Sequence, residues 1–266
     1  ILKKIEESGD TGLRLLIKKY DNTFYKNISH SIVTKKEISN AYSETPKKVV
    51  SHLRKAMRNI KSFSKQQKLK SWTIKIKGSK LGEKVTPINS VGIYVPGGKA
   101  SYPSTVLMNA IPAKVAGVRD ITMVCPPVAG KLNPLVLIAA DLCGVNKIYK
   151  FGGAHAIGAL AYGTETVKPV DKIVGPGNIY VATAKKKVYG SVGIDSFAGP
   201  SEVLIIADQN ASAELVAIDM FAQAEHDELA QAILMTSSKK LIDSVSLKIN
   251  SLIKNQSRKE IIEKSL

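Results

Sequence analysis

Apolar and polar residues alternate with two different periods along this chain of 266 residues. Residues 1–20 and 36–68 carry apolar side chains three or four positions apart among many lysines, which is the spacing of amphipathic helices. Residues 72–77 alternate apolar with polar at every second position and predict a strand. A turn at Gly78 and another strand-like piece at 83–87 follow. The N-terminal part is therefore predicted to be helical with one pair of strands.

From Ser90 onward, short apolar strands alternate with helices that commonly close at glycine. The predicted strands are 91–95, 120–124, 147–151, 172–174, 202–207 and 232–236. The predicted helices are 104–116, 135–143, 154–162, 179–188, 211–229 and 239–254. Strands and helices at these spacings suit right-handed βαβ crossovers. The pattern predicts an α/β fold with parallel sheets.

Three of these strands end in turns rich in glycine: Pro96-Gly-Gly98, Gly152-Gly153 and Gly175-Pro-Gly-Asn178. Ligands of open parallel sheets bind at the carboxyl ends of strands, where glycine lets the backbone come close. We therefore expect the three turns to line one cleft. None of them is Gly-x-Gly-x-x-Gly, so the common dinucleotide fingerprint is absent. The alternative is that these glycines only make tight turns.

One pair of residues could hold a metal ion. Gln223 and His226 lie three positions apart within 215–229, an apolar run with helical period. On a helix they share a face, so the amide oxygen and the imidazole can point at one atom. A zinc site needs about four ligands, and nothing obvious in the following residues completes this one. The alternative is a solvated polar helix face, because histidine is also common on surfaces.

Three further histidines and one serine are considered as functional-site residues. His30 and His52 lie among lysines and are expected at the surface. His155 opens a helix after a glycine turn, where it can donate to a ligand or cap the turn. Ser201 follows Gly199-Pro200, and its hydroxyl can bind substrate or satisfy a turn amide. No base lies near Ser201 in the sequence to make it a nucleophile.

Composition narrows the class of protein. Apolar residues make up 44% of the chain, enough for one large or two smaller α/β domains. The two cysteines, Cys125 and Cys143, are expected to be free buried thiols in a reducing compartment, the cytoplasm. No apolar run is long enough for a membrane span. The net charge of +17 suits nucleic acid, but the lysine-rich stretch 47–84 has little aromatic interleaving besides Trp72, so nucleic-acid binding is not expected.

Five segments together carry a resemblance to a known family. They are Ser90-Val-Gly-Ile-Tyr-Val-Pro-Gly-Gly-Lys99, Tyr102-Pro-Ser-Thr-Val-Leu-Met-Asn-Ala-Ile-Pro-Ala-Lys114, Val174-Gly-Pro-Gly-Asn-Ile-Tyr180, Asp195-Ser-Phe-Ala-Gly-Pro-Ser-Glu202 and Ala222-Gln-Ala-Glu-His-Asp-Glu-Leu-Ala-Gln231. These segments are long, ordered and specific. The chain resembles the histidinol dehydrogenases, weakly before Ser90 and strongly after it.

The resemblance implies an enzyme that oxidises L-histidinol to L-histidine through histidinaldehyde, with zinc and NAD, at the end of histidine biosynthesis. It implies an intertwined homodimer in the cytoplasm and no contact with membranes. The implied fold is α/β with two Rossmann-like parallel-sheet domains. Residues 90–208 correspond to the second domain. Residues 1–89 and 209–266 correspond to parts of the first, which is discontinuous and incomplete.

The resemblance also assigns roles to individual residues. Gln223 and His226 match zinc ligands that also contact substrate, and Ser201 matches a substrate-binding serine. Tyr94 and Asn178 match contacts to NAD. His155 stands where the family usually has a glutamine that contacts NAD, and a histidine offers fewer donors there.

The resemblance further implies that parts of the active site lie outside this chain. The family's catalytic Glu-His pair belongs to an Ala-Pro-Glu-His type of motif, which does not occur in residues 1–266. An aspartate and a histidine that complete the zinc site also lie further along the family's chain. Ile1 falls within a predicted helix, so the natural start is expected to be missing. We expect a truncated form that is inactive alone. The alternatives are that a second chain supplies the rest, or that this is a non-catalytic relative that binds nucleotide or serves as a scaffold.

Overall fold

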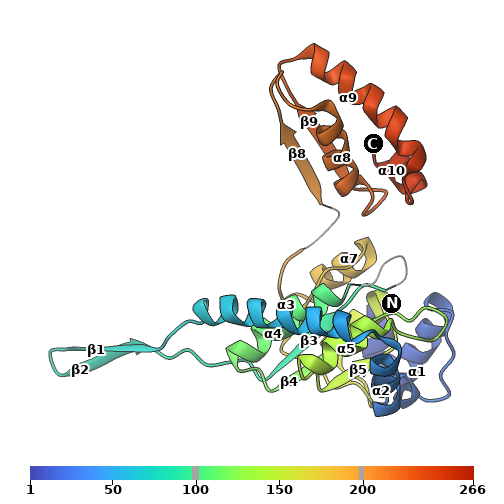
Figure 1. Cartoon of the computed structure of the whole chain (residues 1–266). Helices are drawn as coiled ribbons and strands as arrows, with labels where there is room; N and C mark the ends of the chain where they lie inside the picture. Colours follow the sequence, from blue (N-terminus) through green and yellow to red (C-terminus); the bar gives the residue numbers. More distant parts are fainter. Residues whose placement is uncertain (98–101, 198–200) are drawn as a thin grey trace. The chain divides into compact units, whose positions relative to one another are not determined.

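The chain folds into two compact units, Ile1–Phe197 and Ala198–Leu266 (Figure 1). The structure is a computed structural model that describes residues 1–97, 102–197 and 201–266. Gly98 of the first glycine turn, and Gly199-Pro200 before Ser201, lie outside the described residues. The α/β class and the parallel strands predicted from the sequence are confirmed. The expected joining of 1–89 with 209–266 in one domain stays a prediction; helices from 1–66 pack within the first unit.

A five-stranded parallel sheet forms the centre of the first unit. Its spatial order is β5-β4-β3-β6-β7. The strands are β3 (Ser90–Tyr94), β4 (Asp120–Val124), β5 (Lys147–Tyr149), β6 (Lys172–Val174) and β7 (Gly193–Ile194). The chain moves outward from β3 through β4 to β5, then returns to place β6 on the other side of β3. The order therefore reverses between β3 and β6, which is where open α/β sheets bind ligands.

Helices cover both faces of this sheet, as expected for strands that are apolar along their whole length. The two faces carry separate apolar clusters. One cluster joins α1 (Leu2–Tyr20), α6 (Gly153–Tyr162) and α7 (Ile179–Val188). The other joins α2 (Lys35–Glu44), α3 (Lys47–Gln66), α4 (Pro103–Ala116) and α5 (Pro134–Leu142). Ile93 and Tyr94 are adjacent in β3 and point into different clusters, so the sheet fixes the direction of each side chain.

The predicted helix 36–68 is wrong in one respect, because it is two helices. Glu44 ends α2 and Lys47 begins α3. Thr45 is extended, with φ −101° and ψ 129°, as expected for a residue before proline. Pro46 lacks the N–H that a continuous helix would need. A 3-10 turn, η1 (Ile28–Ser31), precedes this pair.

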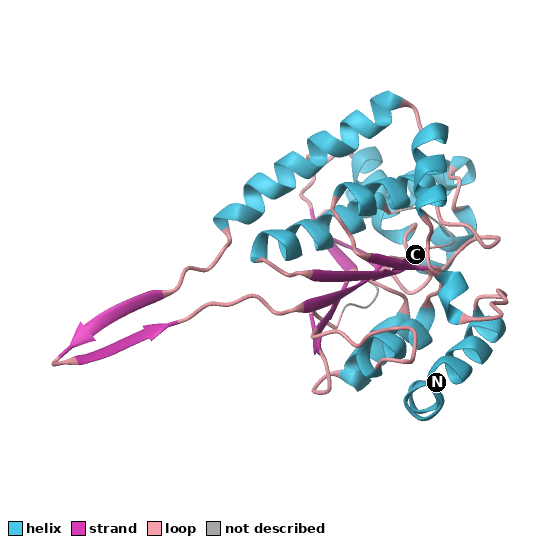
Figure 2. Ribbon diagram, turned by 90° about the horizontal axis from the view of Figure 1, so that it is seen from below, coloured by secondary structure: helices cyan, strands magenta, loops and turns pink. Residues whose placement is uncertain are grey.

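A hairpin projects from the end of α3 (Figures 1 and 2). Strand β1 (Trp72–Ile76) pairs with β2 (Ser79–Glu83), and all of their residues are exposed. The predicted second strand, 83–87, is placed too late. Lys77 and Gly78 both have positive φ, 42° and 85°, so they close a two-residue turn that matches the strand twist.

The second unit is a βαβα arrangement around two parallel strands. Its elements are β8 (Glu202–Ile206), α8 (Ala213–Ala224), β9 (Gln231–Met235), α9 (Lys239–Leu252), the 3-10 turn η2 (Ile253–Asn255) and α10 (Lys259–Ser265). Helices α8 and α9 bury Val216, Ala217 and Leu241 with one face of the sheet. The side chains of Leu204, Ile206, Ile233 and Met235 are exposed. In the ranges that the structure describes, we find no helix with the length and apolar character needed to cross a bilayer.

Candidate functional site

Tyr94 links two of the glycine turns in the first unit. It is the last residue of β3, only 4% exposed, and its hydroxyl accepts a hydrogen bond from the Gly153 N–H at 3.0 Å. Burial raises the pKa of the Tyr94 phenol well above its ordinary value. The phenol therefore keeps its proton at neutral pH. One O–H donor stands at the carboxyl end of the central strand, with its oxygen already oriented by the Gly152-Gly153 turn.

His155 lies in an internal pair with Asp21. Its Nε2 is 3.0 Å from Asp21 Oδ2, and the same carboxylate oxygen accepts the Gly152 N–H at 3.0 Å. The histidine is 1% exposed and its ring lies near Tyr20. If Nε2 carries the proton that Asp21 accepts, Nδ1 of a neutral ring is an acceptor. Asp21 thus holds the turn and is itself in contact with His155, whose contact with NAD stays a prediction.

Asp21 is a site residue that the sequence analysis did not find. It follows α1 directly, more than 130 positions before the turn that it holds. Nothing local in the sequence distinguishes it from an ordinary aspartate after a helix. Only the packing of α1 against α6 brings it to Gly152.

The third turn, Gly175 to Asn178, ends at the N-terminus of α7. Asn178 is exposed, and its Oδ1 accepts the Val181 N–H at 3.1 Å as the helix cap. Gly175 is buried with φ 109°, and a Cβ there would collide with the Tyr94 carbonyl oxygen. The turn therefore requires glycine and lies directly beside β3. Turns 152–153 and 175–178 both approach Tyr94, and the lining of one cleft by the glycine turns stays a prediction.

In the second unit, Gln223 is oriented by a hydrogen bond to the start of β8. Its Nε2 donates to the Ser201 carbonyl oxygen at 2.8 Å. This contact directs the amide nitrogen into the fold and leaves Oε1 for another partner. Ser201 is exposed and precedes β8, so this pair lies at the amino end of the strand.

The predicted helix 211–229 is too long, so His226 lies beyond the helix that carries Gln223. Helix α8 ends at Ala224, and His226 lies in the bend that follows. Further along, Asp227 Oδ1 accepts the Leu229 N–H in a local turn, so the predicted helical residues 226–229 are not helical. Arg258, which the sequence analysis also missed, donates to the Glu225 carbonyl at 3.0 Å and fixes the bend.

The metal donors present are incomplete. His226 is exposed, and its backbone N–H donates to the Gln223 carbonyl at 3.2 Å, so the two residues stay one turn apart. Among the described residues, no three side chains of histidine, cysteine, aspartate or glutamate gather where they could hold a metal ion. Gln223 and His226 are compatible with two of the roughly four ligands that zinc requires.

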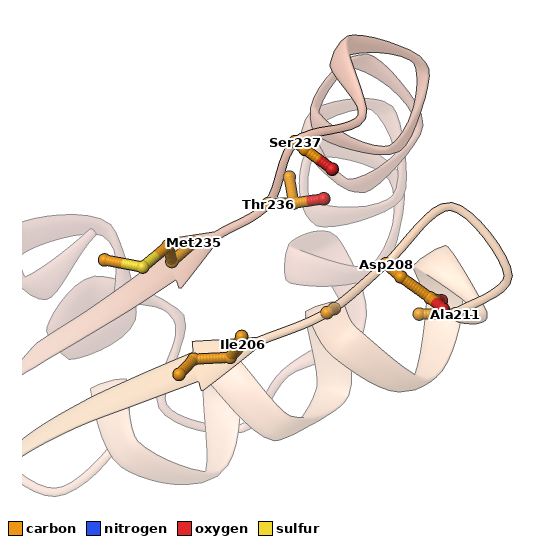
Figure 3. Close-up of a pocket in the computed structure, with 7 residues that line it drawn as sticks. Ile206, Asp208, Ala211, Met235, Thr236 and Ser237 are labelled. Carbon is orange, nitrogen blue, oxygen red and sulfur yellow. The ribbon is translucent and has the colours of Figure 1, made fainter.

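A separate pocket of about 650 Å³ lies where β8 and β9 end (Figure 3). Its polar side chains are Asp208, Thr236 and Ser237. Asp208 Oδ1 accepts the Asn210 N–H, and Thr236 Oγ1 accepts the Ser238 N–H, so both already serve turns. The pocket lies at the opposite end of β8 from Ser201, and we assign no ligand to it.

The cysteines are buried and free, as predicted. Burial raises the pKa of the Cys125 thiol to about 12 and that of Cys143 to about 11. Reactive thiols instead have lowered pKa values and partial exposure. Neither cysteine suits nucleophilic catalysis.

Comparison with known proteins gives a consistent match along the whole chain. A family model described as histidinol dehydrogenase matches residues 1–266. A histidinol dehydrogenase of Neisseria gonorrhoeae is 49% identical over 267 residues, and one of Methanocaldococcus jannaschii is 52% identical over 269. Each alignment covers 100% of this chain and 62% of the relative.

A solved structure agrees. The crystal structure of histidinol dehydrogenase from Elizabethkingia anophelis superposes with a TM-score of 0.89 at 38% identity. The match covers 99% of this chain and 61% of that one. The chain therefore spans about three fifths of the length of the relatives that it matches.

Proposed function

This chain belongs to the histidinol dehydrogenase family, and we propose that it supplies the NAD-binding unit and part of the zinc site for oxidation of L-histidinol to L-histidine. The reaction would pass through histidinaldehyde, at the end of histidine biosynthesis in the cytoplasm. One observation carries the proposal: two glycine turns meet Tyr94 where the strand order reverses, in a chain that this family matches from end to end.

Three residues would contact the dinucleotide. Tyr94 offers a phenol proton, and Asn178 is exposed at the N-terminus of α7. Backbone N–H groups at such a helix start favour phosphate oxygens. His155 would act through Nδ1, since Asp21 holds Nε2 and the Nδ1 side of the ring lies beside Gly153. NAD, when bound, accepts the hydride, and these residues orient it.

Gln223 and His226 would ligate zinc and contact substrate beside Ser201. The bond from Gln223 Nε2 to the Ser201 carbonyl supports this role, because it fixes Oε1 as the free, ligating atom of the amide. The bend held by Arg258 fixes His226 relative to it. Zinc, when bound, polarises the substrate hydroxyl as a Lewis acid. The remaining ligands and the general base would come from polypeptide outside residues 1–266, so this chain alone would be inactive.

We further propose that the whole protein is a homodimer. The exposed face of β8 and β9 carries Leu204, Ile206, Ile233 and Met235, and such a contiguous apolar face favours burial against further polypeptide. The hairpin adds exposed Trp72 and neighbouring isoleucines, and two strands alone are marginally stable in water.

A second candidate is a nucleotide-binding relative without catalysis. The incomplete donor set around His226 favours it. Under this alternative, the first unit would bind NAD+ and the second would bind no zinc even when the rest of a full-length chain is present.

The experiment is calorimetric titration of residues 1–266 with NAD+, together with an assay of NADH absorbance after L-histidinol is added. We expect NAD+ binding and no NADH. Sustained NADH production would contradict the proposal that the base lies elsewhere. Absence of NAD+ binding would contradict the assignment of the first unit. Zinc bound stoichiometrically by a full-length enzyme but lost on Gln223→Ala would exclude the second candidate.

A further inference from the structure

Lys185 and Asp195 form a charged pair that hydrogen-bonds to Gly175, at the start of the turn that leads to Asn178. Lys185, in α7, is 1% exposed, whereas the Asp195 side chain just after β7 is 31% exposed. The Lys185 ammonium contacts Asp195 Oδ1 and donates to the Gly175 carbonyl at 3.0 Å. Asp195 Oδ2 accepts the Gly175 N–H at 2.7 Å. Both polar backbone groups of Gly175 are therefore satisfied by this one pair of side chains.

Gly175 needs such partners because of where it lies. Strand β6 ends at Val174, so the sheet hydrogen bonds stop one residue before Gly175. The residue is buried with φ 109°, and a buried backbone N–H or C=O without a hydrogen-bond partner destabilises the fold. Because the N–H and C=O of Gly175 are buried, Asp195 and Lys185 replace water as their hydrogen-bond partners.

Stability alone does not account for a buried lysine. Val181, Ala184 and Val188 share the buried face of α7 with Lys185. An ammonium loses several kcal/mol of hydration there, and apolar residues of similar size are often as stable as a buried ion pair. What an apolar residue cannot do is donate to the Gly175 carbonyl. Lys186 and Lys187 are exposed, so Lys185 is the buried one of these three consecutive lysines.

We propose that Lys185 and Asp195 are positioning residues that hold the Gly175–Asn178 turn in the conformation that the dinucleotide requires. This inference rests on the proposed function, in which Asn178 contacts NAD. Asp195 also lies two positions before Phe197, the last residue of the first unit. The same pair therefore fixes the turn and the last residues of the first unit.

The test compares NAD+ affinity of the 266-residue chain and of three variants by calorimetry. Lys185→Met keeps the length and packing of the side chain and removes its donors. Lys186→Met is the matched control, because it makes the same substitution at the neighbouring, exposed lysine of the same helix. Lys185→Arg restores a cation. We expect at least a tenfold weaker affinity for Lys185→Met, and values within threefold of wild type for the other two.

Amide hydrogen exchange supplies a local measurement. Lys185→Met should speed exchange in peptides covering 175–181 by at least tenfold and leave β4 unchanged. The double variant Lys185→Met/Asp195→Asn, which leaves no buried charge unpaired, should behave the same way if the single variant unfolds. Unchanged affinity and exchange would overturn the inference, as would an Arg variant as impaired as the Met variant.

The two proposals fail differently. If the wild-type chain binds no NAD+, the proposed function is contradicted. The positioning role of Lys185 and Asp195 is then judged on hydrogen exchange alone. If wild type binds and Lys185→Met binds equally, the positioning role is wrong and the proposed function stands.

Discussion

Replacement of Asp21 by alanine tests how the Gly152-Gly153 turn is held. One carboxylate oxygen, Oδ2, accepts the Gly152 N–H at 3.0 Å and lies 3.0 Å from His155 Nε2, which is a donor to it in the tautomer protonated at Nε2. The Asp21 side chain is 9% exposed and His155 is 1% exposed. Alanine removes the acceptor and leaves two donors in a place that water hardly reaches.

The expected loss of stability follows from the two hydrogen bonds that Asp21→Ala removes. A hydrogen bond to a charged group contributes about 1.5–3 kcal/mol, and a buried donor left unpaired costs a similar amount. Because the two bonds share one oxygen, we expect the free energy of unfolding to fall by about 3–5 kcal/mol. That is a large part of the roughly 5–15 kcal/mol that stabilises a typical domain.

This fall in the free energy of unfolding is measured by urea unfolding, followed by circular dichroism at ~222 nm, the ordinary helix band. With a slope of about 1–3 kcal/mol per molar urea, the midpoint should fall by at least about 1 M. Glu6→Ala is the control, because Glu6 is an exposed acid on the same helix with no side-chain hydrogen bond among the described residues. It should change stability by less than about 0.5 kcal/mol. If Asp21→Ala lowers the free energy of unfolding by less than about 1 kcal/mol, the proposed role of Asp21 in holding the turn is wrong.

Three further outcomes follow from the structure. Gly175→Ala should destabilise the chain by at least about 1–3 kcal/mol, measured by urea unfolding, and equal stability would contradict the strained turn. Burial raises the pKa of Glu37, but hydrogen bonds from Lys150 and Thr34 outweigh it and keep the pKa below its ordinary value. The Glu37–Lys150 pair therefore stabilises the fold above the ordinary pKa of glutamate. The stability difference between wild type and Lys150→Met should shrink as pH falls from 7 to 3, and a constant difference would contradict this expectation. Cys125 and Cys143 should react with a thiol reagent at pH 8 only after denaturation, and fast labelling of the native chain would show that they are not buried.

Local sequence patterns located most of the fold. Strands 120–124 and 172–174 and helix 179–188 have the predicted bounds, because each is a short apolar or amphipathic segment closed by glycine, proline or a cap. Errors arose where single residues decide the backbone. Positive φ at Lys77 and Gly78 moved the second strand of the hairpin, and β7, with two residues, was too short to recognise.

The site was only partly predictable, for a physical reason. Tyr94 stands at the end of a strand before a glycine turn, so its position could be expected from the sequence. Asp21, Lys185 and Asp195 act through contacts that depend on how helices pack on the sheet. Lys185 did carry a weak signal, since it shares the helical face of buried valines, whereas Asp21 carried none.

Amide hydrogen exchange of the chain with and without NAD+ tests the central claim most directly, namely that the turns beside Tyr94 hold the dinucleotide. NAD+ addition should slow exchange in peptides covering 94–97, 152–156 and 175–181, with the second unit unchanged. Protection confined to residues 201–266, or none anywhere at saturating NAD+, would contradict it.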